Sequence, residues 1–180
     1  MNQKIKLITV ICGVLIVVHI LNILTQGSLF VLGIRPGDVS SLPNILTAPF
    51  VHGTWTHLAN NLFGLIIFSA LCLLRGVKFY LISSFIIIVL TGLLVWFFAR
   101  KAVHIGASGW IFGLWSLSIA IAFFQRSFTN IAIAIFVLFF YGGMIYGVLP
   151  RDSYISFESH LFGVISGIVC AYLVTKNRIG

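Results

Sequence analysis

Residues 106–124 read GASGWIFGLWSLSIAIAFF, a serine set among small residues at the head of a long apolar run. A later apolar run opens in a comparable way, with Ser159 and His160. Serine and histidine are the two side chains that acyl-transfer catalysis needs, one as the nucleophile and one as the base. The two runs therefore predict a pair of membrane helices with a hydrolytic serine and histidine at their starts.

The amino-acid composition indicates a protein that resides in lipid. Hydrophobic residues make up 60% of the chain and charged residues 8%, and the mean hydropathy is +1.14. A soluble domain carries about 25% charged residues. Because the chain has too few charges to cover a surface that faces water, we expect an integral membrane protein surrounded by the lipid bilayer.

Six apolar stretches approach the length of roughly 20 residues that a helix needs to cross a bilayer. They contain no lysine or arginine, and the polar–apolar alternation of a barrel strand is absent. No small-x-small cleavage site follows the first stretch, which favours a helix over a signal peptide. We expect an all-α membrane protein, a six-transmembrane-helix bundle forming one domain over residues 1–180. The stretches are residues 7–24, 56–74, 79–99, 107–124, 131–149 and 159–175.

The eleven lysines and arginines help to give the chain a net charge of +8. They are scattered and form no basic stripe, which favours membrane topology over nucleic-acid binding as their explanation. With the N-terminus inside, seven fall on the inner side and four on the outer side. This bias favours both termini in the cytoplasm. The inner set is Lys4, Lys6, Arg75, Lys78, Arg126, Lys176 and Arg178, and the outer set is Arg35, Arg100, Lys101 and Arg151.

The three cysteines, Cys12, Cys72 and Cys170, all lie within apolar stretches. Their number and wide spacing match neither a disulfide framework nor a zinc pattern. The chain also lacks phosphate-loop, dinucleotide-binding and HExxH motifs. We expect no cofactor and no metal ion.

Polar residues cluster at the starts of the second, fourth and sixth stretches, although a bilayer makes such residues costly. With the N-terminus inside, these three helices all run inward from the outer face, so their starts lie at one depth. The clusters therefore predict one shared site that opens toward the outer face. They comprise His52, His57 and Asn61, then residues 104–108, and finally Glu158, Ser159 and His160.

The chemistry of these residues suggests their roles. Ser108 would attack a carbonyl carbon, and a histidine such as His160 suits the role of the base that takes its proton. The acidic residues of the chain are Asp38, Asp152 and Glu158, and none lies deep in a stretch. Glu158 stands two positions before His160, a spacing at which helical neighbours do not face each other. A hydrolase built on these residues would use a Ser–His dyad.

A developing oxyanion needs hydrogen-bond donors that are already in position. His57 and Asn61 are four residues apart and share one helix face. Gly106 and Gly109 let the backbone come close, so the Ser108 amide is a third donor. These groups are the predicted oxyanion hole.

Glycine pairs follow both members of the dyad. Gly109 and Gly113 follow the serine, and Gly163 and Gly167 follow the histidine, each pair four residues apart. Small residues at this spacing let membrane helices approach closely. Because a dyad requires the fourth and sixth helices to touch, we expect these glycines to face one another.

Simpler explanations exist for several of these residues. Ser108 taken alone is more often a helix cap than a nucleophile. His19 is expected to hydrogen-bond a neighbouring helix. His52 and His104 are expected to be solvated near the interface, although His104, four residues before Ser108, is an alternative base.

The fifth stretch combines aromatic residues with glycines. Its aromatic side chains between residues 136 and 141 favour packing against lipid over a substrate gate. Glycines at positions 142, 143 and 147 either loosen the outer end of this helix or serve packing.

Taken together, the motifs resemble those of the rhomboid family of intramembrane serine proteases. The Gly-x-Ser-Gly motif of that family stands here as residues 106–109. Its histidine motif resembles residues 159–163 with Gly167 beyond them. Its His-x-x-x-Asn element matches residues 57–61, with His52 five positions before His57. The resemblance covers nearly the whole chain, as a minimal six-helix core of bacterial type.

The resemblance implies an intramembrane serine endopeptidase in a bacterial inner or plasma membrane. Residues 25–54 would form a partly embedded first loop, residues 149–158 would cap the site, and the fifth helix would flank substrate entry. Substrates would be single-span membrane proteins, cut near the outer end of a helix. The implied site comprises the nucleophile Ser108, the base His160, the oxyanion-hole residues His57, Asn61 and Ser108, and the supporting residues Gly106, Gly109, Phe112, Gly163 and Gly167.

Two positions depart from the family pattern. Many bacterial members have a tyrosine four residues after the serine, where this chain has Phe112, so ring stacking is kept and the hydroxyl is lost. The Trp-Arg pair often found in the first loop is missing, with Pro43 and Asn44 in that region. A non-proteolytic rhomboid-like protein that binds client helices is the main alternative. A small transporter fits less well, because neither internal repeats nor mid-membrane charges occur.

Overall fold

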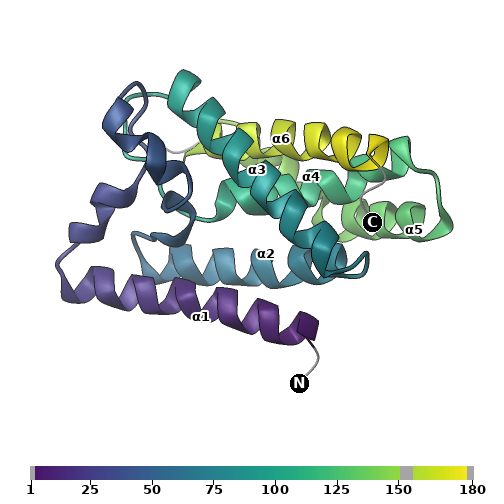
Figure 1. Cartoon of the computed structure of the whole chain (residues 1–180), viewed down its shortest axis with the longest axis horizontal. Helices are drawn as coiled ribbons and strands as arrows, with labels where there is room; N and C mark the ends of the chain where they lie inside the picture. The colour runs from purple at the N-terminus through teal and green to yellow at the C-terminus, as the bar shows by residue number, and fades with distance from the viewer. Residues whose placement is uncertain (1–2, 151–155, 178–180) are drawn as a thin grey trace.

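The computed structural model describes residues 3–150 and 156–177, and this part of the chain forms helices without any strand (Figure 1). The described residues include six α-helices, and four 3-10 helices lie in the long connections from α1 to α2 and from α5 to α6. The α-helices are α1 (Gln3–Leu24), α2 (Trp55–Leu73), α3 (Val77–Phe98), α4 (Ser108–Phe124), α5 (Phe128–Tyr141) and α6 (Phe157–Lys176). The 3-10 helices are η1 (Ser28–Leu32), η2 (Val39–Ile45), η3 (Ala48–Phe50) and η4 (Gly142–Val148).

Five helical segments are long and apolar enough to cross a membrane: α1, α2, α3, α6 and the combined segment of α5 and η4. The sixth, α4, has 17 residues and is shorter. The predicted fifth stretch, residues 131–149, does not form one continuous α-helix. It changes to 3-10 geometry at Gly142, where glycine weakens the α-helix. Of the two explanations for the glycines, packing applies to Gly147, where a Cβ would lie 2.6 Å from Phe112 Cζ, and the change of geometry accompanies Gly142 and Gly143.

Three of the α-helices have a serine or threonine as the N-cap residue, whose side chain accepts a hydrogen bond from an amide of the first turn. Thr54 Oγ1 accepts from the amide of His57 at the start of α2. Ser127 does the same for α5, and Ser156 accepts from the amide of Ser159 at the start of α6. These caps set the first turn of α2 and α6, the two helices that carry predicted site histidines.

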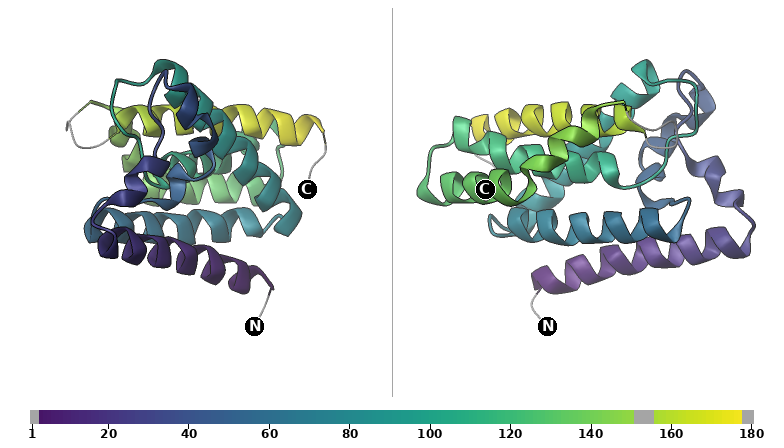
Figure 2. Two further views of the ribbon diagram at one scale, coloured as in Figure 1. Left: turned by 60° about the vertical axis from the view of Figure 1, so that its left-hand side comes forward. Right: turned by 180° about the vertical axis from the view of Figure 1, so that it is seen from behind.

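Helix α4 lies at the centre of the bundle, where it packs most extensively against α6 and also contacts α2, α3 and α5 (Figures 1 and 2). Most of its residues are buried, from Gly109 to Ile121. Helix α1 lies at the periphery beside α2, and only Leu15, His19 and Asn22 of α1 are buried. The central position of α4 agrees with its sequence, because a helix that is apolar all round is expected at the interior of a membrane bundle.

The contact between α4 and α6 depends on glycines that face each other. A Cβ added at Gly163 would strike the carbonyl oxygen of Gly109 and lie 3.1 Å from Phe112 Cβ. A Cβ added at Gly167 would strike the carbonyl oxygen of Gly113 and the hydroxyl of Ser116. The predicted facing of the two glycine pairs is confirmed, and it brings the starts of α4 and α6 together.

Replacing Gly167 with alanine is expected to destabilise this contact, because the added methyl group meets backbone atoms that cannot rotate away. Overpacking of this kind costs about 1–3 kcal/mol. Thermal unfolding in detergent should show a lower midpoint for Gly167→Ala than for wild type. Gly13→Ala is the matched control, since a Cβ at Gly13 has nothing within 4 Å. Equal midpoints for Gly167→Ala and wild type would contradict the proposed packing.

The first loop, residues 25–54, folds over the segment that leads into α4. Ile34 and His104 exchange two backbone hydrogen bonds, at 3.0 and 2.9 Å. Within the loop, the amide of Asn44 donates to the carbonyl oxygens of Val31 and Gly33, at 2.8 and 2.9 Å. Asn44 thus links two parts of the first loop by hydrogen bonds, in the region where the family's Trp-Arg pair is missing.

Candidate active site

Ser108 is the first residue of α4 and is partly buried. The turn before it needs glycine, because Gly106 has a φ of 106°, a conformation that side chains rarely tolerate. The Gly106 amide donates to Ala48 O at 2.9 Å. A Cβ at this position would lie 2.6 Å from His57 Cε1 and Nε2. The small residues before Ser108 therefore let the first loop and His57 approach the serine.

His160 lies in the first turn of α6, with its ring held on two sides. Its Nδ1 lies 2.9 Å from the carbonyl oxygen of Gly147. A carbonyl oxygen only accepts, so Nδ1 carries the proton and donates, and Nε2 is left as an acceptor. In soluble serine proteases a buried carboxylate fixes the histidine tautomer. Here the backbone of η4 does so.

Phe112 forms the second support of the His160 ring. The two rings are stacked, with centroids 4.2 Å apart and planes inclined by 6°. Phe112 lies one turn after Ser108, and helical side chains lean toward the N-terminus of their helix. The imidazole is thus stacked on a residue one helical turn from Ser108. Gly147 must be small here, because a Cβ would lie 2.6 Å from Phe112 Cζ.

Ser108 and His160 are brought to the same end of the α4–α6 contact, but the two side chains are not hydrogen-bonded to each other. Within the described residues, the Ser108 hydroxyl has no recorded hydrogen-bond partner, and His160 bonds to Gly147. Catalytic hydrogen bonds are often long before substrate binds. Neither the Ser108 hydroxyl nor His160 Nε2 is therefore committed to another hydrogen bond among the described residues.

For the catalytic role of His160 proposed below, removing the Phe112 ring is expected to slow the reaction by roughly tenfold, since stacking contributes about 0.5–1.5 kcal/mol and fixes the orientation of the imidazole. Phe112→Ala should lower kcat for any peptide that the protein cleaves. Phe112→Tyr keeps the stack and should stay near the wild-type rate. Steady-state kinetics of the two variants test this, and equal rates for Phe112→Ala and wild type would show that the stack has no orienting role.

His57 and Asn61 of α2 lie against Gly106, two residues before Ser108. The His57 ring contacts the Gly106 position, and Asn61 Nδ2 would be 3.8 Å from a Cβ there. Asn61 is buried, and its amide donates to the His57 carbonyl oxygen at 2.9 Å. Two side chains with N–H groups thus lie beside Gly106, two residues before Ser108, and their part in an oxyanion hole stays a prediction.

A polar support behind His57 was not predicted from the sequence. His19 Nδ1 and Asn22 Nδ2, both from α1, donate to the carbonyl oxygen of His52 at 3.1 and 3.4 Å. The His52 ring meets the His57 ring edge-on, with centroids 4.9 Å apart. The spacing of His19 and Asn22 on one face of α1 was a signal, but their common partner is a backbone atom of a loop.

The expected solvation of His52 and His104 is wrong. Their side chains are buried, with relative exposures of 0% and 3%. Burial lowers the pKa of His52 to about 4, and the neighbouring His57 adds to this shift, so the His52 ring is neutral at pH 7. Both nitrogens of His104 have partners, Ser156 and the Arg100 carbonyl. His104 is therefore not positioned to serve as an alternative base for Ser108.

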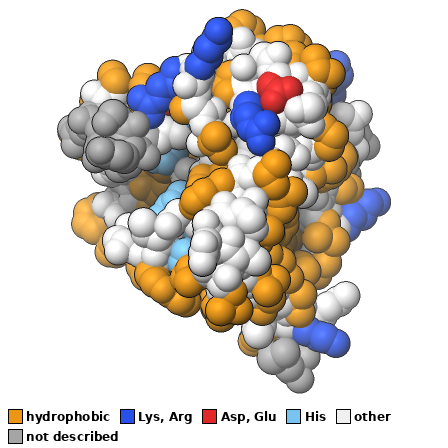
Figure 3. Space-filling view, turned by 90° about the vertical axis from the view of Figure 1, so that its left-hand side faces the viewer, with side chains coloured by type: hydrophobic (Ala, Val, Ile, Leu, Met, Phe, Trp, Pro, Cys, Tyr) orange, Lys and Arg blue, Asp and Glu red, His pale blue; other side chains and the backbone are white. Residues whose placement is uncertain are grey.

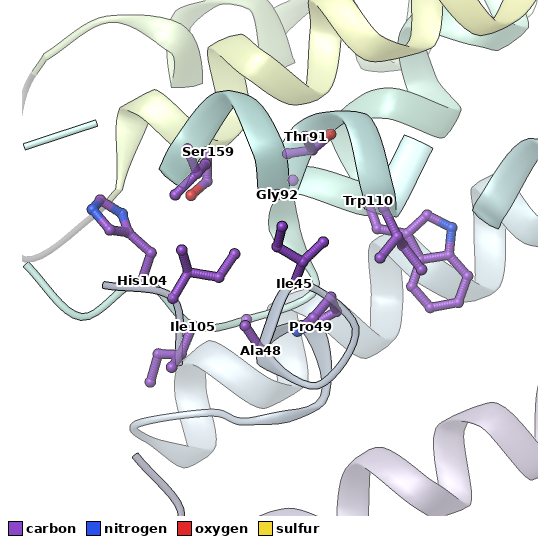
Figure 4. Close-up of a pocket in the computed structure, with 14 residues that line it drawn as sticks. Ile45, Ala48, Pro49, Thr91, Gly92, His104, Ile105, Trp110 and Ser159 are labelled. Carbon is purple, nitrogen blue, oxygen red and sulfur yellow. The ribbon is translucent and has the colours of Figure 1, made fainter. Parts of the chain in front are cut away.

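A small cavity of about 30 Å³ lies beside the start of α4, between α3 and the first loop (Figure 4). Its wall includes the backbone of Gly109 and the side chains of Thr91, Trp110 and Ser159. Thr91 Oγ1 and Trp110 Nε1 are buried without a hydrogen-bond partner. A space of this size accommodates one or two water molecules.

Figure 3 looks onto the end of the molecule where the first loop lies. Hydrophobic side chains cover much of this face, and histidine side chains are visible between them.

Comparison with known proteins shows that the rhomboid domain family model matches residues 39–177. An uncharacterized protein of Mycobacterium tuberculosis is 33% identical over 172 residues, which cover 91% of this chain and 72% of that protein. An uncharacterized protein of Mycobacterium leprae is also 33% identical, covering 91% of this chain and 68% of its own length. Rhomboid-like protein 11, chloroplastic, of Arabidopsis thaliana is 30% identical over 146 residues, 73% of this chain and 52% of that protein.

Proposed function

The chain belongs to the rhomboid family, and on that premise we propose that it is a serine endopeptidase that cleaves transmembrane segments of other membrane proteins. The observation that carries the proposal is the position of His160. Its ring is stacked on Phe112 one turn from Ser108, and its Nδ1 is held by Gly147 O. This support leaves His160 Nε2 without a hydrogen bond among the described residues, as the role of a base requires.

The proposed reaction follows from this geometry. Ser108 Oγ attacks the carbonyl carbon of the scissile bond while His160 Nε2 takes the hydroxyl proton. His57, Asn61 and the Ser108 amide donate to the oxyanion of the tetrahedral intermediate. His160 then gives the proton to the leaving amine, and an acyl-enzyme on Ser108 remains. Water, activated by His160 Nε2, hydrolyses the acyl-enzyme and regenerates the serine.

The proposed architecture has six spans, with α4 as a short sixth span at the centre of the other five. A helix of 17 residues reaches the lower limit for crossing a bilayer. Both termini would lie in the cytoplasm of a bacterium, in keeping with seven basic residues on that side and four on the other. The starts of α2, α4 and α6 would then open toward the outer face of the inner or plasma membrane.

The proposed substrates are helices of single-span membrane proteins, and α5 would flank their entry. Phe139 and Phe140 of α5 are 80% and 63% exposed, which suits a helix that faces lipid. Tyr141 points inward instead and contacts Phe68 of α2 edge-on at 5.4 Å. The residues proposed for catalysis lie on α2, α4 and α6, so α5 would serve substrate entry only.

Reconstitution into liposomes with a single-span reporter protein tests the proposal. Cleavage within or beside the outer end of the reporter helix, located by mass spectrometry, is the expected result. The alternative function, binding of client helices without proteolysis, predicts that the reporter is cross-linked to the protein but stays intact. Intact reporters across a panel of transmembrane sequences, with the protein shown to be folded, would favour that alternative.

A further inference from the structure

A second polar cluster, separate from the dyad, joins the segment before α4 to the start of α6. Ser156 Oγ lies 2.7 Å from His104 Nδ1 and 2.7 Å from Ser159 Oγ. His104 Nε2 lies 3.0 Å from the carbonyl oxygen of Arg100. These residues, His104, Ser156 and Ser159, are here named the His104 junction. From the sequence, His104 was expected to be solvated or to be an alternative base, and no role was expected for Ser156.

The direction of every hydrogen bond in the junction follows from the Arg100 carbonyl. Because that oxygen only accepts, His104 Nε2 carries the proton and Nδ1 is an acceptor. The Ser156 hydroxyl must then donate to His104 Nδ1. Its oxygen accepts from the Ser159 hydroxyl at 2.7 Å and from the Ser159 amide at 3.2 Å. Both ring nitrogens of His104 and the hydroxyls of Ser156 and Ser159 thus take part in hydrogen bonds, and a hydrogen-bonded network whose members are satisfied is rigid.

The position of the junction relates it to the dyad. His104 lies four residues before Ser108, and Ser156 lies four residues before His160. The junction therefore joins the two segments that deliver the nucleophile and the base. Further along the same contact, a Cβ at Gly109 would lie 3.1 Å from the carbonyl oxygen of Ser159.

The backbone of His104 adds a third connection. Its amide donates to Ile34 O at 2.9 Å, and its carbonyl accepts from Ile34 N at 3.0 Å. One buried residue thus binds the first loop through its backbone and the start of α6 through its side chain. Beside it, Arg100 Nε lies 3.4 Å from Glu158 Oε1 and bridges the same two segments.

We propose that the His104 junction is a positioning device that sets the separation of Ser108 and His160, and that Ser156 and His104 are positioning residues for the reaction. The inference rests on the proposed function. The dyad lacks a hydrogen bond of its own in this state, so its alignment depends on how the two segments are joined. A misplacement of about 1 Å can slow an enzyme by roughly a hundredfold.

Three variants separate the effect of the His104 junction on the reaction from the effect of the N-cap on the stability of α6. His104→Phe keeps a ring but removes both nitrogens, and it leaves Ser156 as the cap. Ser156→Ala removes the junction and the cap together, and Ser156→Thr restores the hydroxyl. The rate of fluorophosphonate labelling of Ser108 is expected to fall at least about tenfold in His104→Phe and Ser156→Ala, and to recover in Ser156→Thr. With a cleaved peptide, kcat should fall while KM stays unchanged.

Ser69→Ala is the matched control. It also deletes one buried hydroxyl pair between two helices, since Ser69 Oγ lies 2.9 Å from Tyr80 Oη, but it is remote from the dyad. It should lower the thermal midpoint and leave the labelling rate unchanged. An absent adduct on folded wild-type protein would overturn the proposed function. Equal labelling of wild type and His104→Phe would overturn the junction alone.

The tautomer of His104 gives a test that does not depend on any variant being active. Nitrogen chemical shifts of ¹⁵N-histidine-labelled wild-type protein should show an unprotonated Nδ1 and a protonated Nε2 for His104. The signal is assigned by its loss in a His104 variant. The opposite tautomer would overturn the proposed chain of hydrogen bonds even if Ser156→Ala failed to fold.

Discussion

Ser108→Ala is expected to abolish cleavage of a membrane-embedded reporter, with a loss of kcat on the order of 10⁶-fold, the effect of removing the nucleophile from a serine protease. The structural cost should be small, because the Ser108 hydroxyl has no recorded hydrogen-bond partner among the described residues and is only partly buried. Time courses of reporter cleavage in liposomes measure the effect.

Ser118→Ala is the matched control for this variant. Ser118 lies on the same helix and donates its hydroxyl to Leu114 O at 2.8 Å, away from the start of α4. Its replacement should leave cleavage near the wild-type rate. Residual cleavage by Ser108→Ala at more than a few per cent of wild type would mean that another group is the nucleophile.

Replacing His160 is expected to have an effect of the same order, about 10⁶-fold, because nucleophile and base act as a unit. His160→Ala removes the base but also the ring that stacks on Phe112 at 4.2 Å. His160→Asn removes the base while keeping an N–H group that can donate to Gly147 O. Both variants should lack cleavage activity.

The comparison of the two His160 variants separates chemistry from packing. His160→Asn should unfold at a temperature closer to wild type than His160→Ala, yet be equally inactive. The double variant with Ser108→Ala should be no slower than either single variant, since removal of one partner already abolishes the function of the other. Substantial activity in His160→Asn would exclude His160 as the base.

The sequence allowed prediction of the helices because each apolar run is bounded by charges or glycines. The first predicted stretch ends at Leu24, as α1 does, and the second, 56–74, agrees with α2 to within one residue at each end. The contact of α4 with α6 could be predicted from the glycine pairs, but its contacts with α2, α3 and α5 could not. The other residues of α4 are apolar on all sides, so no face indicates which of these helices it meets.

The sequence allowed prediction of those site residues that are polar side chains within or beside an apolar stretch. Ser108, His57 and Asn61 stand out for that reason. The Gly147 carbonyl could not be found, because a backbone acceptor in a 3-10 helix leaves no mark in the sequence. His104 was misjudged because a histidine near the end of a span resembles a solvated one, and its partner Ser156 is 52 residues away.

The most direct test of the central claim is fluorophosphonate labelling of the purified protein in mild detergent, read by intact mass and then by peptide mapping. This asks whether a serine is activated, without any knowledge of the substrate. A single adduct on Ser108, absent from Ser108→Ala and His160→Ala, is the result expected for a working Ser–His dyad. No adduct on folded wild-type protein, or an adduct on a different serine, would contradict it.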